Sequence, residues 1–136
     1  MKTLPLFEAG AAAGLALGLA GAAAAADTPP AQKGHDNCFR SSDWDGWHAP
    51  NDKTLYLRVR LHDIYQVDLN SPSSMLTWPD THLVNVIRGS NYICSPLDLQ
   101  LTVTQNNSSA REPLFLKTIT KLTPEQIAAI PKKDLP

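Results

Sequence analysis

Strict alternation of apolar and polar side chains marks two segments of this chain. Residues 55–61 alternate three leucines and a valine with a tyrosine and two arginines, and residues 97–103 alternate three leucines and a valine with aspartate, glutamine and threonine. A period of two places one set of side chains on a buried face of a strand and the other set toward water. Both segments are therefore predicted to be half-buried β-strands.

A third apolar series, Tyr65, Val67 and Leu69, follows the first segment closely enough to form a hairpin with it. Matching the two apolar faces fixes the register, because a slip of one residue would turn a whole face to water. The predicted buried pairs are Leu61–Tyr65, Val59–Val67 and Leu57–Leu69, and the predicted outer pairs are Arg58–Asp68 and Arg60–Gln66. The connection between the strands is then residues 62–64.

A second hairpin and a final strand are predicted further along the chain. Residues 82–88 form a strand in this interpretation, turn at Gly89-Ser90 and return over residues 91–94, because Gly followed by Ser suits a type II′ turn. The polar residues 105–111 are predicted to be a loop. Residues 113–122 then form the last strand, whose two faces differ little in polarity.

One short helix is predicted at the C-terminal side of the strands. Thr123 is a typical N-cap, Pro124 suits the first helical position, and Gln126 lies where a capping-box partner is expected. Pro131 is expected to end the helix. About six short strands followed by one helix indicate a mainly β fold, an antiparallel meander curled into a small barrel or sandwich.

The first 26 residues have the pattern of a secretory leader. Lys2 precedes a run of Ala, Gly and Leu over residues 9–26, which ends in the small-residue site Ala24-Ala25-Ala26 before Asp27. This pattern predicts a signal peptide of residues 1–26, with cleavage near Ala26-Asp27 and a periplasmic or secreted mature protein. An uncleaved membrane anchor and a wrongly assigned start are the alternatives.

The remainder of the chain is expected to contain one domain. Residues 27–37 carry Pro, Gly and Lys with almost nothing apolar, which predicts a flexible tail. Residues 38–136 are predicted to form a single β-rich domain, because about 100 residues match the usual size of one domain. No integral membrane span is expected once the leader is removed.

Cys38 and Cys94 are the two cysteines of the chain. In an oxidising compartment outside the cytoplasm they are predicted to form a disulfide. Such a bridge would close a loop of about 57 residues and contribute roughly 4 kcal/mol on the chain-entropy model. A redox pair is the alternative, although catalytic pairs usually lie close together as Cys-x-x-Cys.

Composition and charge narrow the classes of partner. The formal net charge is −1, which argues against a nucleic-acid-binding surface. The histidines, at positions 35, 48, 62 and 82, lack the spacing of a dedicated metal site, and no cofactor-binding motif is present. An envelope protein or a small ligand is the expected kind of partner.

The densest cluster of chemically active side chains lies just before the first clear strand. It combines carboxylates, indoles and an imidazole, with Trp78 as a further candidate: Asp43, Trp44, Asp45, Trp47, His48 and Trp78. Aromatic faces and carboxylates are the groups that bind sugar rings or divalent metals. The alternative is a turn whose tryptophans cover one end of the core while the aspartates are solvated, since the spacing matches no calcium-loop pattern.

The sequence contains no motif that indicates nucleophilic catalysis. No serine lies in a Gly-x-Ser-x-Gly elbow, and Arg88-Gly89-Ser90, which could present N–H groups to an anion, is explained as well by a hairpin turn. No catalytic residue is therefore predicted. A hydrolase with a site assembled from scattered residues stays a remote third hypothesis.

Several short segments, taken in order, resemble a known family. They are Cys38-Phe39, residues 55–59 and 65–69, the run from Arg88 to Cys94, and Leu122-Thr123-Pro124-Glu125-Gln126. Together they resemble a family of small exported bacterial proteins that is catalogued only as a domain of unknown function. The resemblance covers most of the chain after residue 26, and it implies a periplasmic protein with paired cysteines at the two matching positions. It implies no activity.

These observations lead to a non-enzymatic, exported β-domain with a binding or structural role. The second hypothesis is a small-ligand site, for a sugar or a divalent metal, at the end of the domain that carries Trp44, Trp47 and His48. A concave pocket lined by Trp47, His48 and Trp78 would favour ligand binding, whereas indoles buried against the core would favour the structural role.

Overall fold

The computed structural model describes residues 37–136, and the predicted signal peptide and all but the last residue of the predicted tail lie outside them. Within the described residues the chain forms nine short strands and one short helix, which confirms a mainly β fold. The strands are β1 (Phe39–Arg40), β2 (Trp44–His48), β3 (Thr54–Val59), β4 (Asp63–Leu69), β5 (Thr81–Asn85), β6 (Tyr92–Ile93), β7 (Leu101–Gln105), β8 (Arg111–Leu114) and β9 (Leu116–Lys121). The helix is α1 (Pro124–Ala129), and the 3₁₀ turns are η2 (Ser41–Asp43), η3 (Ser74–Thr77) and η4 (Lys132–Asp134).

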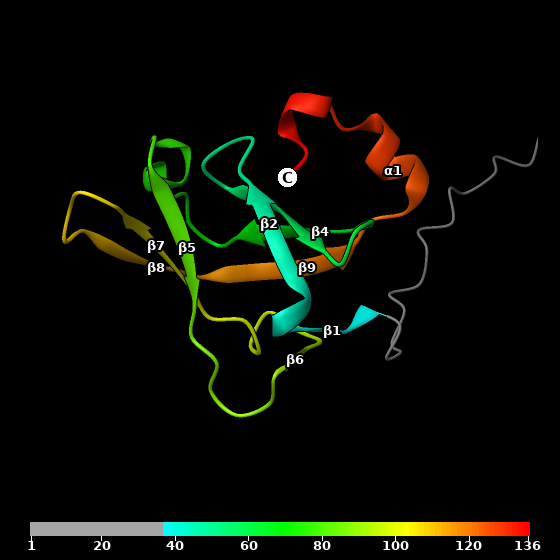
Figure 1. The fold of residues 1–136 in the computed structure, drawn as a ribbon, viewed down its shortest axis with the longest axis horizontal. Coiled ribbons are helices and arrows are strands. Elements are labelled where there is room, and N and C mark those ends of the chain that lie inside the picture. The colour runs from blue at the N-terminus through cyan, green and yellow to red at the C-terminus, as the bar shows by residue number, and fades with distance from the viewer. Residues whose placement is uncertain (1–36) are drawn as a thin grey trace, which may run out of the picture. The chain divides into compact units, whose positions relative to one another are not determined.

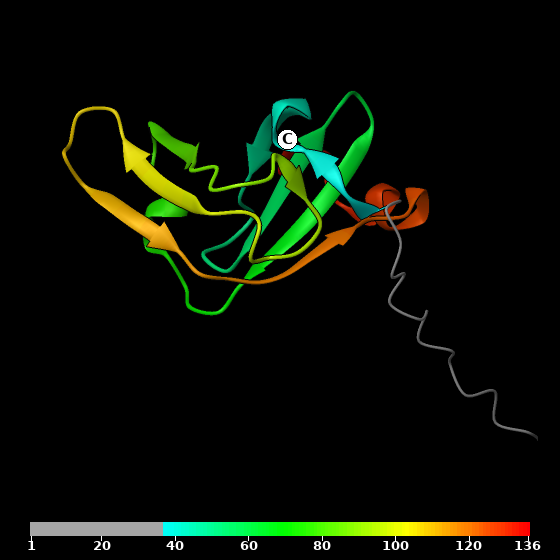
Figure 2. The same cartoon turned by 90° about the horizontal axis from the view of Figure 1, so that it is seen from below.

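The strands pair antiparallel in three sheets (Figure 1). One sheet has the order β2-β3-β4-β9, the second has the order β5-β7-β8, and β1 pairs with β6 in the third. Only Phe115 separates β8 from β9, so a single bent segment of chain belongs to both larger sheets (Figure 2). The two sheets therefore form one bent surface whose outer edges are β2 and β5. These edges are not paired in the part of the chain that the structure describes, so the predicted barrel is not closed.

One continuous core lies between the sheets. Alternate residues of β3 are buried, as the sequence pattern requires, and β4 and β7 bury residues of the same kind. The buried cluster comprises Phe39, Leu55, Leu57, Val59, Tyr65, Val67, Leu69, Met75, Leu76, Ile93, Leu99, Leu101, Val103 and Leu114. The rings of Phe39 and Tyr65 lie 4.7 Å apart, which joins the small β1–β6 sheet to the same core.

The predicted register of the β3–β4 hairpin is wrong, although its buried faces are right. Leu57 pairs with Tyr65, and Leu55 pairs with Val67. The chain reverses directly after Val59, with Arg60 in a left-handed conformation at φ 56° and Leu61 77% exposed in the turn. The observed register pairs all six residues of β3, whereas the predicted one would extend β3 beyond the end of β4. The even-numbered shift keeps every apolar side chain on the buried face.

The second predicted hairpin is also wrong. β5 pairs with β7, and β6 pairs with β1 through Phe39–Ile93 and Arg40–Tyr92. Gly89 does adopt a positive φ of 99°, but it lies in a connection between strands of different sheets. The cysteine pairing supplies the physical reason, because it holds the residue before β1 against the residue after β6. Sequence periodicity alone carries no information about this long-range contact.

Several predicted strands have other limits than expected, among them β5, which ends at Asn85 and not at residue 88, and two of the differences have a clear physical reason. The segment from residue 97 begins with a turn, in which the Asp98 N–H donates to the Ser95 carbonyl at 3.1 Å, so the strand starts at Leu101. Residues 113–122 belong to two strands, because the chain passes from one sheet to the other at Phe115. The change of sheet explains why the two faces of this segment differ little in polarity.

The helix prediction is confirmed in detail. The Thr123 hydroxyl accepts a hydrogen bond from the Gln126 N–H at 3.3 Å, and the Gln126 side chain accepts one from the Thr123 N–H at 2.9 Å. Pro124 occupies the first turn. In residues 37–136 no helix has the length and hydropathy that a membrane crossing requires.

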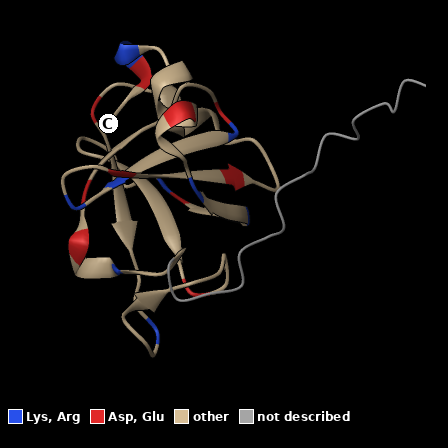
Figure 3. Ribbon diagram, turned by 90° about the vertical axis from the view of Figure 1, so that its right-hand side faces the viewer, with Lys and Arg blue, Asp and Glu red and all other residues tan. Residues whose placement is uncertain are grey.

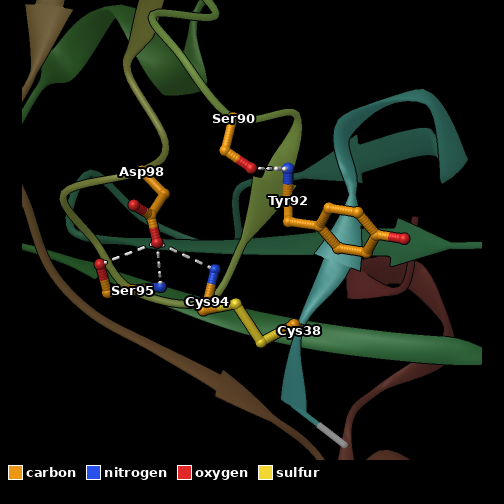
Figure 4. Close-up of a disulfide and its surroundings, with 6 residues drawn as sticks. All are labelled: Cys38, Ser90, Tyr92, Cys94, Ser95 and Asp98. Atoms are coloured by element: carbon orange, nitrogen blue, oxygen red, sulfur yellow. Dashed lines mark hydrogen bonds between the residues drawn. A yellow bond between two sulfur atoms is a disulfide. The ribbon is translucent and has the colours of Figure 1, made fainter. Parts of the chain in front are cut away.

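The predicted disulfide between Cys38 and Cys94 is present (Figure 4). Beside it, one carboxylate oxygen of Asp98 accepts three hydrogen bonds, from the N–H groups of Cys94 and Ser95 and from the Ser95 hydroxyl, at 3.1, 2.9 and 3.0 Å. The bonds to the Cys94 N–H and to Ser95 hold the pKa of Asp98 below its usual value, because they stabilise the ionised carboxylate. The turn that follows Cys94 is therefore held by the disulfide and by hydrogen bonds to one carboxylate.

Candidate ligand-binding cleft

β2 carries most of the predicted site, and its pairing with β3 decides where each side chain lies. Trp47 pairs with Leu57 and His48 with Tyr56, while a bulge between Trp44 and Gly46 interrupts the ladder. Bulges re-aim neighbouring side chains and are frequent at sheet edges. The predicted residues consequently divide into an ion-paired group, a tryptophan that packs against the core, and a group that lines a cleft.

The two predicted aspartates are paired with arginines. Asp45 Oδ1 lies 2.8 Å from Arg58 Nε, and Asp43 Oδ2 lies 3.3 Å from Arg60 Nε. Arg60 also lies 3.8 Å from Asp63, which in turn lies 3.1 Å from the amine of Lys121. Carboxylates that already face cations attract a metal ion weakly. No group of three or more potential metal ligands occurs among residues 37–136.

Arg58 lies across β2 and connects it to the last residues of the chain. Its Nη1 donates to the backbone oxygen of Pro136 at 2.9 Å, in addition to the contact with Asp45. A methyl group at Gly46 would lie 2.9 Å from Arg58 Nη2, so any larger residue there would displace the guanidinium. Gly46 thus gives Arg58 room to reach both partners.

The surroundings of Trp44 indicate a structural role. Its indole Nε1 donates to the Gly46 carbonyl at 2.7 Å, and its ring packs against the hydrophobic core. A buried indole usually finds a partner for its N–H in this way. Trp44 therefore matches the alternative in which a tryptophan covers one end of the core, and it does not line the cleft described next.

Trp47, His48 and Trp78 line one cavity of about 470 Å³. Trp47 and His48 come from the end of edge strand β2, and Trp78 precedes edge strand β5, so the cavity lies where the two unpaired edges approach each other. Trp47 also packs against the core, whereas Trp78 is 46% exposed. We call this cavity, completed by Ala49, Pro50, Leu76, Thr77, Asp80 and Thr81, the tryptophan cleft.

The turn that carries Trp78 is held by backbone contacts. The Trp78 N–H donates to the Met75 carbonyl at 3.2 Å, and the Thr81 hydroxyl donates to the Trp78 carbonyl at 3.1 Å. Asp80 adopts a left-handed conformation with φ 58°, and its carbonyl accepts from the Asn106 N–H at 3.2 Å. Residues held in sparsely populated conformations are frequent at functional sites.

Asp134 approaches His48, one of the residues that line the cleft. Its Oδ1 lies 3.6 Å from His48 Nε2, because the chain after α1 returns toward β2 (Figure 1). Tyr56, the partner of His48 in the ladder, has a raised pKa, chiefly through burial and further through the negative charges of Asp134 and Asp68. His48 is therefore oriented beside an acidic group at the rim of the cleft.

Charged residues of both signs are distributed along the described part of the chain. Figure 3 shows acidic and basic segments interspersed over the ribbon, with neither sign gathered on one side. This distribution agrees with the formal net charge of −1.

A family model matches residues 3–134, and its description is Family of unknown function (DUF6491). The chain belongs to the DUF6491 family. This confirms the resemblance inferred from the sequence segments. No curated protein and no solved structure matches the chain.

In this DUF6491 protein the structure brings together half of the six residues predicted from the sequence. Trp47, His48 and Trp78 meet in the tryptophan cleft, whereas Asp43, Trp44 and Asp45 do not line it. Sequence reasoning missed Asp80, for which the turn-forming run Trp78-Pro79-Asp80 was the available signal. It also missed the arginine partners of the aspartates, because the predicted hairpin register assigned those arginines to other residues.

Proposed function

We propose that this DUF6491 protein is an exported binding module that holds a small, hydroxyl-rich molecule, such as a sugar, in the tryptophan cleft. The observation that carries the proposal is the meeting of Trp47 and Trp78, far apart in sequence, in one cavity in which Trp78 is half exposed. A large aromatic face left accessible beside polar groups is a typical feature of ligand sites.

The chemistry of the cleft favours a ligand with one apolar and one polar side. The indole of Trp78 offers a flat apolar surface to the C–H face of a sugar ring. The carboxylate of Asp80 has no hydrogen bond to the described residues and can accept from a ligand hydroxyl, and His48, also in the lining, can exchange hydrogen bonds with a ligand. A metal ligand is less favoured, because Asp43 and Asp45 already face arginines.

Titration calorimetry with a panel of mono- and disaccharides tests the proposal. Trp78→Ala should weaken binding of the best saccharide by about tenfold, as expected for the loss of one aromatic contact of 1–2 kcal/mol. Tyr92→Ala is the matched control, because Tyr92 is 45% exposed on β6 and does not line the cleft. Unchanged affinity of Trp78→Ala, or no saccharide binding by the wild-type protein, would overturn the proposal.

We also propose that residues 1–26 direct the protein out of the cytoplasm and are cleaved off during export. The leader pattern supports this, and the Cys38–Cys94 disulfide is of the kind that persists in oxidising compartments. Intact-mass measurement on the protein from fractionated cells should find a periplasmic or secreted species beginning near Asp27. A cytoplasmic species that retains Met1 would contradict export.

A further inference from the structure

A second cavity, of about 510 Å³, lies where β7, β8 and the turn after Cys94 meet. Buried Leu99, Leu101 and Leu114 contribute to its lining, as do the exposed Val86, Leu97 and Phe115. Leu97 is 89% exposed and Phe115 is 65% exposed. We call this cavity the leucine groove; it shares no residue with the tryptophan cleft.

The exposed apolar side chains of the leucine groove belong to segments whose backbone is fixed by hydrogen bonds and by the nearby disulfide. Leu97 lies in the turn fastened by Asp98 and adjoining the disulfide. The Phe115 carbonyl accepts from the Asn70 N–H at 2.8 Å. A segment held in this way cannot easily turn its apolar side chains inward, so the groove presents them to the solvent.

The backbone within the groove favours a ligand that needs no main-chain hydrogen bonds. β7 is paired on both sides, by β5 and β8, whereas β8 is an edge strand of its sheet. Pro113 in β8 has no N–H, and the carbonyls of Phe115 and Leu116 already accept from Asn70. Along β7 and between Pro113 and Leu116, a peptide strand would therefore find few free partners. A flexible hydrocarbon chain requires only apolar contact.

The groove has one charged lining residue. Arg88 lines it and has no hydrogen bond or ion pair with any residue in the range 37–136. The other polar lining residues, Asn70, Gln100 and Thr102, are neutral. An unpaired guanidinium at an apolar groove complements a ligand with an anionic head and a hydrocarbon tail.

We infer that the leucine groove binds a single acyl chain with a carboxylate head, that is, a free fatty acid, with Arg88 facing the carboxylate. The tail would cover Leu97 and Phe115, and the site would operate independently of the tryptophan cleft. This ligand class goes beyond the sugar binding proposed above. A lipid bilayer would use the same apolar residues differently, and the test separates a bilayer from a single acyl chain.

Laurate below its micelle concentration is the probe, with dodecanol as its neutral counterpart, and calorimetry on the oxidised protein is the measurement. Wild-type protein should bind laurate saturably. Arg88→Ala should weaken laurate binding by about fivefold, the upper value for an exposed ion pair, and leave dodecanol binding unchanged. Leu97→Asn should weaken both by about tenfold, because one leucine loses its apolar contact.

Two control variants remove a cation or a leucine outside the groove. Arg111→Ala removes an exposed cation that does not line the groove, and Leu61→Asn removes a leucine exposed in the β3–β4 turn; neither should change laurate binding. Trp78→Ala should retain it too, which separates this inference from the proposed function. No saturable laurate binding, an equal effect of Arg88→Ala on both probes, or binding only to phosphatidylcholine–phosphatidylglycerol vesicles would overturn the inference.

Discussion

At the scale of single residues, short-range hydrogen bonds explain the local geometry better than hydrophobic pattern does. Asp98 is polar and lies in a segment that alternates as a strand would, yet its carboxylate folds the chain into a turn by accepting from Cys94 and Ser95. Aspartate is well suited to this role because its short side chain bonds the backbone nearby. The consequence is an exposed Leu97 in place of a buried one.

Asp98→Asn should reduce stability at neutral pH and have little effect in acid. The folded-state pKa of Asp98 lies below the unfolded value of 3.8, so its contribution is present above that value and is lost as the pH falls through the folded pKa. Solvent screening keeps the contribution to at most about 1 kcal/mol. Melting temperatures of both proteins from about pH 7 to pH 2 should therefore converge toward the acid end.

The control for this experiment is Asp52→Asn, because Asp52 is exposed and its side chain has no hydrogen bond to the described residues. The Asp52 variant should follow the wild-type curve throughout. A constant gap between Asp98→Asn and wild type across the whole pH range would contradict the role given to the carboxylate.

At the scale of elements, the strand pattern predicts faces reliably but predicts partners poorly. The buried faces of β3, β4 and β7 and the capping box of α1 follow from local sequence. The partner of β6 and the change of sheet at Phe115 do not, because both depend on contacts between distant segments. The register of β3 and β4 failed for a related reason: every even-numbered shift satisfies the same apolar face.

Two leucine variants test the observed register. Leu57→Ala should destabilise the fold by about 2–5 kcal/mol, because Leu57 is fully buried opposite Tyr65. Leu61→Ala should change stability by less than about 0.5 kcal/mol, because Leu61 lies in the exposed turn. Urea unfolding of both variants measures these values. A large loss for Leu61→Ala would favour the register in which Leu61 faces Tyr65 inside the sheet.

At the scale of the whole described region, the disulfide connects two segments whose proximity cannot be predicted from the local sequence. It links the residue before β1 to the residue after β6, and the tryptophan cleft forms where the edge strands β2 and β5 approach without pairing. The sequence identified two of the aromatic residues of this cleft and its histidine by composition. It missed Asp80: the run Trp78-Pro79-Asp80 indicates a turn, but the place of this turn at the cleft depends on how the sheet edges meet.

Removing the disulfide should lower the free energy of unfolding by about 4 kcal/mol, since the bridge constrains a long loop in the unfolded chain. The sequence separation of the cysteines is 56 residues. Urea unfolding of the oxidised protein and of the Cys38→Ala/Cys94→Ala double variant measures the difference. Equal stability of the two proteins would contradict a structural role for the bridge.

The central claim is that the tryptophan cleft is a ligand site and that Trp44, which packs against the core outside the cleft, takes no part in it. Each indole N–H gives its own signal in a ¹H–¹⁵N correlation spectrum, and Trp44 is distinguished by its hydrogen bond to the Gly46 carbonyl. Titration with the best saccharide should shift the indole signals of Trp78 and Trp47 in a saturable way and leave that of Trp44 in place. A titration that leaves Trp78 unmoved, or that shifts Trp44 as much as Trp78, would contradict the claim.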